Sequence, residues 1–367
     1  MGIRSVKSAA VVLGAVFAAI LMVVPPAFAD AAPVATPAAP LVDHHMHIFS
    51  PESARVLKIS CARLGPVRCP PEISTSSSTG QEAVEALDAA GIKQGVLLST
   101  GYFFGSPEVA DLGLDIPAET RAENTFVVSE AKAQCGRLVA FISVDPLRPN
   151  ALDEINYWGR RGGAAGLKLH LGNSAFDFRS PDQVKKLAAV FRAAARWRFP
   201  IVVHLQTRTK DFGAKDVAIF LKDVAPYARG APIQIAHAAA GGGIGPDTLS
   251  ALGAFADAIN HDPAATKNLF FDLAMVPDEM SNTQKLAATP ANIAALKVLI
   301  YRIGLKRFVL GSDWTYPLGL VRYYADEREA LKLPDADWAI LASNVAPYIA
   351  ARQAAPSCST HTASIGK

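Results

Sequence analysis

The sequence predicts an α/β protein with the (β/α)8 architecture of a TIM barrel, in a single domain over residues 41–355. Eight short apolar segments alternate with helical patterns, and the alternating stretch has the size of a TIM barrel, about 250 residues. Alternating β and α units imply a parallel sheet. A doubly wound open sheet is the alternative, but no glycine-rich phosphate-binding loop follows the first apolar segment.

The predicted strands are short, continuous and apolar, as expected for strands that are buried on both faces. Helical patterns separate them, for example over residues 81–90, 181–198 and 291–303. The first and third of these stop at Gly91 and Gly304, and glycine commonly ends a helix. The eight predicted strands are residues 41–48, 94–99, 138–144, 165–170, 200–205, 233–237, 269–274 and 308–311.

We expect residues 1–29 to be a signal peptide, so that the mature protein is exported to the periplasm or secreted. Arg4 and Lys7 form a basic start, an apolar run follows, and Ala27-Phe28-Ala29 fits a cleavage site of small residues. The apolar run is shorter than the ~20 residues that cross a bilayer. No membrane attachment is therefore expected after cleavage.

The composition of the whole chain is ordinary for a globular protein, 50% hydrophobic and 19% charged. Removing Arg4 and Lys7 with the leader lowers the formal net charge from +3 to +1. No basic block of the kind that binds nucleic acid remains, so no nucleic-acid partner is expected. Residues 30–40 are expected to be a flexible lead-in and residues 356–367 a disordered tail. The oligomeric state stays open.

Residues 50–78, after the first strand, are expected to form a long loop, a candidate lid over one face of the barrel. This segment contains Cys61 and Cys69. In an exported protein a disulfide between them is permitted, and we expect one; two thiols in a loop are the alternative. Cys135, at the end of a predicted helix, is expected to be a small buried residue.

Residues that can bind a metal ion stand at the ends of four predicted strands. His45 and His47 are two apart in the first strand, so their side chains point the same way. His204, His237 and Asp313 close the fifth, sixth and eighth strands. Taken singly, each of these residues also has a structural explanation, such as a buried histidine or an aspartate that caps a turn. Because the C-terminal ends of barrel strands meet on one face, the five together predict an open, metal-centred active site.

The order of these motifs resembles the amidohydrolase superfamily, and most closely its amidohydrolase-2 branch, the relatives of aminocarboxymuconate-semialdehyde decarboxylase. The motifs are Asp43-x-His45-x-His47, Gly166-Leu-Lys168-Leu-His170, His204, His237 followed by glycines, and Gly311-Ser312-Asp313. The resemblance implies that His45, His47, His204 and Asp313 bind one divalent ion, and these donor types suit zinc. It also implies that Asp313 takes a proton from a metal-activated water. His237 then orients or deprotonates that water, or binds a second ion.

Four further residues are expected to contact the substrate, a small molecule that carries a carboxylate if Arg208 binds it. In binuclear relatives a lysine at the place of Lys168 is carboxylated and bridges two ions. Because members of this branch are mostly mononuclear, we expect Lys168 to be an unmodified amine and His170 to line the pocket. Arg208 either binds the substrate or is a solvated loop residue, and Trp314 is expected to shape the pocket for a ring or acyl group.

The resemblance implies a metal-dependent hydrolase of a cyclic ester, an amide or a related carbonyl compound. A metal-dependent, non-oxidative decarboxylase of an aromatic or muconate-like acid is the alternative. Predicted export favours hydrolysis, because relatives of the decarboxylase type serve cytoplasmic catabolism. A third interpretation is a metal-dependent binding protein without catalysis. His237 and Asp313 argue against it, because a binding protein needs no proton acceptor beside its metal.

Overall fold

A computed structural model describes residues 39–65, 69, 74–239, 241, 243–276, 289–315 and 319–350. The expected signal peptide, most of the lead-in and the expected tail lie outside these residues. None of the helices in the described ranges combines the length and the apolarity of a bilayer-crossing segment.

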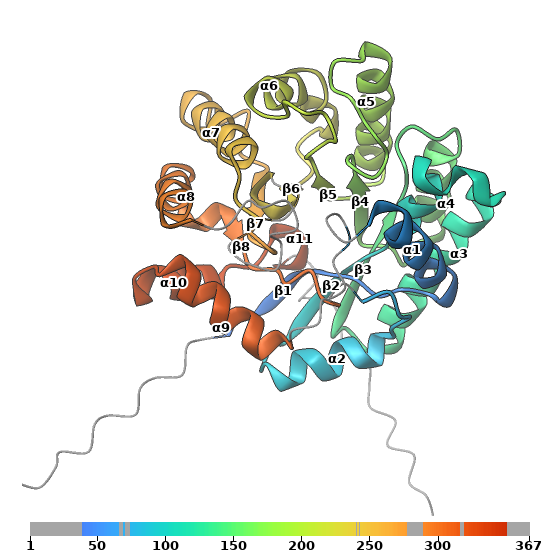
Figure 1. The fold of residues 1–367 in the computed structure, drawn as a ribbon, viewed down its shortest axis with the longest axis horizontal. Helices are drawn as coiled ribbons and strands as arrows, with labels where there is room; N and C mark the ends of the chain where they lie inside the picture. The colour runs from blue at the N-terminus through green and yellow to red at the C-terminus, as the bar shows by residue number, and fades with distance from the viewer. Residues whose placement is uncertain are drawn as a thin grey trace, which may run out of the picture. The chain divides into compact units, whose positions relative to one another are not determined.

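Eight parallel strands form one sheet in chain order (Figure 1). The first and last strands also meet, since His44 N donates to Leu310 O at 3.0 Å and Asp313 N donates to His45 O at 2.7 Å. The sheet is therefore a nearly closed barrel, which confirms the predicted TIM barrel. The strands are β1 (Val42–Met46), β2 (Gln94–Leu98), β3 (Leu138–Ser143), β4 (Gly166–His170), β5 (Ile201–His204), β6 (Ile233–Ile235), β7 (Leu269–Asp272) and β8 (Phe308–Val309).

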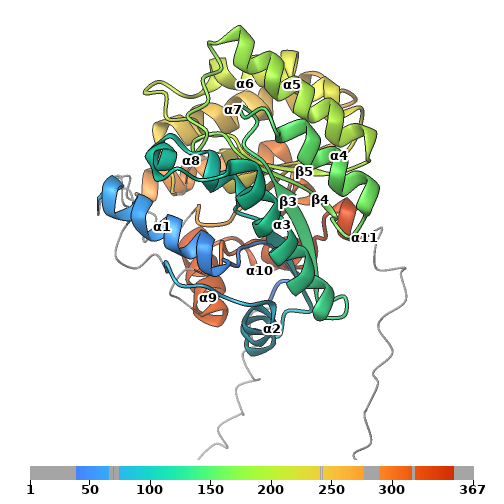
Figure 2. The same cartoon turned by 90° about the vertical axis from the view of Figure 1, so that its right-hand side faces the viewer.

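Helices surround the barrel (Figures 1 and 2). The α-helices are α1 (Pro51–Leu64), α2 (Gly80–Ala89), α3 (Ile116–Ala133), α4 (Ala151–Arg161), α5 (Pro181–Arg196), α6 (Ala214–Asp223), α7 (Pro246–His261), α8 (Pro290–Ile303), α9 (Leu320–Leu331), α10 (Asp335–Ser343) and α11 (Pro347–Ala350). Short 3-10 turns also occur, namely η1 (Gly101–Gly105), η2 (Pro107–Leu112), η3 (Ala225–Ala228), η4 (Ala236–Ala239) and η6 (Leu305–Arg307).

The sequence supplies the caps that begin several of these helices. Thr79 and Glu82 form a capping box at α2, in which Glu82 accepts from the backbone N of Thr79 at 2.7 Å. The side chains of Ser180 and Thr289 cap α5 and α8, and each is followed by a proline, which suits the first helical turn. Gly304 ends α8 at a φ of 98°, a conformation that favours glycine.

The strands are buried on both faces because their alternating side chains enter two apolar layers. Val96 and Leu98 of β2 belong to the layer inside the barrel, whereas Leu97 joins the layer between the sheet and the helices. The inner layer also includes Tyr348 and Ile349 of α11. In the two views, α11 lies at the end of the barrel opposite α1 (Figures 1 and 2). The C-terminal segment therefore closes the end where the strands begin.

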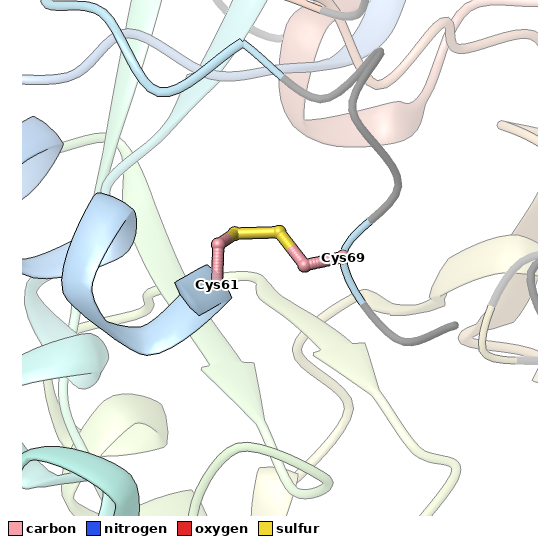
Figure 3. The surroundings of a disulfide bond; sticks show 2 residues. All are labelled: Cys61 and Cys69. Carbon is pink, nitrogen blue, oxygen red and sulfur yellow. A yellow bond between two sulfur atoms is a disulfide. The ribbon is translucent and has the colours of Figure 1, made fainter. Parts of the chain in front are cut away.

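The segment after β1 differs from the expectation. Residues 51–64 form α1 rather than a loop, because Ser50 caps the helix and Pro51 occupies its first position. Cys61 and Cys69 are joined by a disulfide at the end of this helix, as expected (Figure 3). Cys135 is exposed rather than buried, because it lies in the turn after α3.

Candidate metal centre

The predicted site residues come from the C-terminal ends of five strands, as the barrel topology requires. His237 lies just beyond its strand, in η4, and not within β6 as expected. The other positions are His45 in β1, His47 after it, Lys168 and His170 in β4, His204 at the end of β5, Arg208 in the following loop, and Asp313 and Trp314 after β8.

Three of the predicted ligands form a compact group. The ligand atoms of His45, His47 and Asp313 lie within 4.8 Å of one another. One carboxylate oxygen, Asp313 Oδ1, is 3.1 Å from His47 Nε2 and 3.4 Å from His45 Nε2. Two imidazoles and a carboxylate that converge in this way fit a divalent ion such as zinc.

Hydrogen bonds on the far side of the rings fix which nitrogen faces the site. His47 Nδ1 donates to Leu98 O at 2.7 Å, and His237 Nδ1 donates to Ala274 O at 2.7 Å. His45 Nδ1 donates to the Asp272 carboxylate at 3.1 Å. Each Nδ1 therefore carries the proton and each Nε2 keeps a lone pair, the tautomer that a metal ligand needs.

His204 and His237 adjoin this group without being part of it. The His237 ring lies 4.7 Å from that of His45 and 5.0 Å from that of His204. The structure thus brings the five predicted residues to one place, but His204 is not part of the group whose ligand atoms lie within 4.8 Å of one another. His237 and Asp313 adopt positive φ angles of 54° and 61°. Such backbone strain is often found at functional sites.

Burial sets the charges of the site. It lowers the pKa values of His45, His170 and His204 well below the usual histidine range, so these rings are neutral. Burial also opposes the charge on Asp313, but interactions with His45 and His47 hold the pKa of this carboxyl well below its usual range. Asp313 is therefore ionised at neutral pH.

Lys168 places a buried amine directly beside the metal-ligand group. Its side chain is 1% exposed, and its Nζ lies 3.1 Å from His45 Nε2. Burial lowers the pKa of Lys168 to about 8, which still leaves it largely protonated at neutral pH. The site thus contains a cation that an anionic group of a substrate could approach.

His170 is held as a hydrogen-bond donor. Asn173 N donates to His170 Nδ1 at 3.1 Å, so the proton of the neutral ring is on Nε2. The ring stacks on that of His204 at 3.7 Å and lies 5.1 Å from that of Tyr102. A ring in this tautomer offers an N–H to a substrate and no lone pair at Nε2 to an ion.

Arg208 and Trp314 contact residues outside the metal-ligand group. The Arg208 guanidinium forms an ion pair with Glu108 of η2, which links the loops after β5 and β2. Its side chain remains 31% exposed. Trp314 packs partly against the outer apolar layer and forms a bridge with Met46 of β1.

Asp272, the last residue of β7, is not among the residues predicted from the sequence. This fully buried carboxylate accepts from His45 Nδ1, from Gln234 Nε2 at 2.6 Å and from the backbone N of His237 at 2.8 Å. The ligand atoms of His45, His237 and Asp272 also form a group within 4.8 Å. Asp272 closes an apolar run, Leu269-Phe-Phe, and this is the signal that identified Asp313.

Comparison with known families gives one match over most of the chain. A family model described as amidohydrolase matches residues 42–341. No curated protein matches the chain.

Three solved structures have a similar barrel. A 5-carboxyvanillate decarboxylase from Novosphingobium aromaticivorans, with bound manganese, is 12% identical with a TM-score of 0.53, over 83% of this chain and 95% of that one. A Burkholderia multivorans amidohydrolase with bound zinc is 15% identical with a TM-score of 0.52, over 86% and 98%. A 2,6-dihydroxybenzoate decarboxylase is 15% identical with a TM-score of 0.53, over 86% and 98%. At these identities the likeness establishes the fold.

Proposed function

Because the chain belongs to the amidohydrolase family, we propose that it is a metal-dependent enzyme acting on a small, carboxylate-bearing substrate. The observation that carries the proposal is the convergence of His45, His47 and Asp313 within 4.8 Å. The donor set favours zinc, with His204 completing the ligands. A divalent ion held there would polarise a carbonyl or carboxylate oxygen of the substrate.

Three side chains bind the substrate or transfer the proton. Lys168 contributes the positive charge that attracts the substrate carboxylate, and His170 contributes the N–H that orients it. Asp313, held ionised, exchanges the proton. Removing a proton-transfer group of this kind typically costs about 10² to 10⁴ in rate.

Hydrolysis of a cyclic ester, an amide or a related bond is the first candidate, and the ionised Asp313 favours it. Water attacks the carbonyl carbon, Asp313 takes the proton, and the C–O or C–N bond breaks as the leaving group is protonated. Predicted removal of residues 1–29 and export are part of this proposal. A mature N-terminus near residue 30 in the extracytoplasmic fraction would support it.

Non-oxidative decarboxylation is the second candidate, and it fits the solved relatives better. Two of the three described above are named as decarboxylases of aromatic acids. In that reaction the bond from the ring to the carboxylate breaks, carbon dioxide leaves, and the ring carbon takes up a proton. Lys168 and His170 would then hold the carboxylate that is lost.

A substrate panel separates these candidates. The zinc-loaded protein is incubated with lactones, cyclic amides and hydroxylated aromatic acids, while acid release and carbon dioxide release are both recorded. Asp313→Asn and chelator-treated protein are the controls. Acid release that both controls abolish supports the first candidate, and carbon dioxide release supports the second. Zinc binding with no turnover across the panel would favour a binding protein instead.

A further inference from the structure

A chain of hydrogen bonds inside the barrel links the C-terminal segment, residues 346–348, to the candidate metal centre. Tyr348 OH donates to Gln234 Oε1 at 2.6 Å, and Gln234 Nε2 donates to Asp272 Oδ2 at 2.6 Å. His45 Nδ1 donates to the same carboxylate oxygen at 3.1 Å. We propose that Gln234 and Tyr348 are positioning residues that hold Asp272, and through it His45, in the arrangement that binds the ion. This inference rests on the proposed metal site.

The direction of every bond in this chain is fixed. The hydroxyl of Tyr348 donates to the amide oxygen of Gln234, so the amide NH2 faces Asp272. The other carboxylate oxygen, Asp272 Oδ1, accepts from His237 N at 2.8 Å and from Ala274 N at 3.2 Å. Asp272 therefore cannot rotate without breaking backbone hydrogen bonds. Its Oδ2 keeps the proton of His45 on Nδ1, which leaves Nε2 to the ion.

The hydroxyl of Tyr348 makes a hydrogen bond in addition to the packing of its ring. Its ring packs between Phe141 and Phe270, with centroid distances of 5.0 and 5.9 Å. A hydroxyl buried among aromatic rings is costly unless it is paired, so a phenylalanine would suffice if the segment only closed the barrel. Gln234 is the partner that the structure gives it.

The same segment contacts the neighbouring histidine of β1. Ala346 N donates to His44 Nε2 at 3.1 Å, while His44 Nδ1 donates to Leu310 O at 3.0 Å. Residues 346–348 thus reach β1 through His44 and β6 through Gln234. In each contact one partner, Ala346 or Tyr348, lies beyond residue 341, the last residue of the family match. The family model therefore covers Gln234 but not Tyr348.

The proposal is tested by measuring the Zn²⁺ affinity of the full chain in competition with a chromogenic chelator. Gln234→Leu removes a donor from Asp272 and should weaken Zn²⁺ binding about tenfold, the lower end of the effect of such supporting residues. Tyr348→Phe should cause a smaller loss. The double variant should bind as Gln234→Leu does, because the hydroxyl acts only through the amide.

Ile349→Val is the matched control, because Ile349 is buried in the same helix and makes the same apolar layer. It should lower the melting temperature without changing Zn²⁺ affinity. As a second readout, the Nδ1 proton of His45 in the metal-free protein should give a downfield NMR signal that Gln234→Leu shifts or abolishes.

Two results would overturn the inference. One is Zn²⁺ affinity unchanged by both Gln234→Leu and Tyr348→Phe; the other is a loss in Ile349→Val as large as that in Tyr348→Phe. A wild-type chain that binds no Zn²⁺ would contradict the proposed function itself, and the inference with it. The two kinds of failure are therefore distinguishable.

Discussion

Replacing Asp272 with Asn should weaken metal binding although Asp272 is not one of the predicted ligands. The carboxylate accepts four hydrogen bonds, two at each oxygen. An amide has only one accepting oxygen. Since the backbone donors at Oδ1 cannot move, the NH2 group of Asn faces His45 Nδ1 and Gln234 Nε2, which are both donors.

The magnitude follows from the tautomer of His45. To avoid a contact between two donors, the ring moves its proton from Nδ1 to Nε2 and loses the lone pair that would bind the ion. Loss of such a supporting carboxylate typically lowers metal affinity about 10- to 100-fold, which corresponds to about 1.4–2.8 kcal/mol.

Chelator competition with Zn²⁺ measures the effect, and Asp216→Asn is the matched control. Asp216 is also a buried aspartate, but it lies in α6 and pairs with Arg179 and with the backbone of Gly213. It should leave Zn²⁺ affinity unchanged. If Asp272→Asn binds Zn²⁺ as tightly as the wild type while remaining folded, Asp272 does not set the tautomer of His45.

Three further predictions concern other groups. Asp313→Asn should lower turnover by about 10² to 10⁴ with the fold retained, as followed by circular dichroism; near-normal turnover would make His237 the proton acceptor. Lys168→Ala should keep one ion per chain and raise KM, whereas loss of an ion would indicate a carboxylated lysine that bridges two metals. Burial raises the pKa of Glu123, in α3, from 4.5 to about 7. The folded protein therefore favours the protonated carboxyl. The stabilisation from this group is complete below about pH 4.5 and is lost as pH rises through 7. Relative to Glu123→Gln, the unfolding free energy of the wild type should therefore fall by about 3 kcal/mol over this range, as measured by urea titration; parallel pH curves would contradict this.

The barrel could be predicted from the sequence because a parallel sheet covered on both faces leaves a plain pattern. Buried strands are continuous apolar runs, and each is followed by a segment with helical spacing. The helix α1 was not predicted; its first turn follows β1 closely, and few of its residues are buried. Only Ser53, Ala54 and Val56 of this helix are buried.

The ligands could be predicted for the same topological reason, since strand ends converge whatever the details of packing. The residues that hold these ligands in place could not be predicted. Asp272 was overlooked among apolar neighbours, and Gln234 reads as an ordinary polar residue within a strand. The contact between Tyr348 and Gln234 joins residues 114 apart in the chain. No local pattern encodes such a contact, because it depends on how the C-terminal segment folds back into the barrel.

Measuring bound metal tests the proposed metal centre itself. The full chain, its metal removed and then restored with zinc, is analysed for bound metal beside His47→Ala, which removes one arm of the proposed site. We expect one tightly bound ion per wild-type chain and substantial loss of that ion in the variant. A wild-type chain that retains no zinc, or a variant that binds it as tightly as the wild type, would contradict a metal centre built on His45, His47 and Asp313.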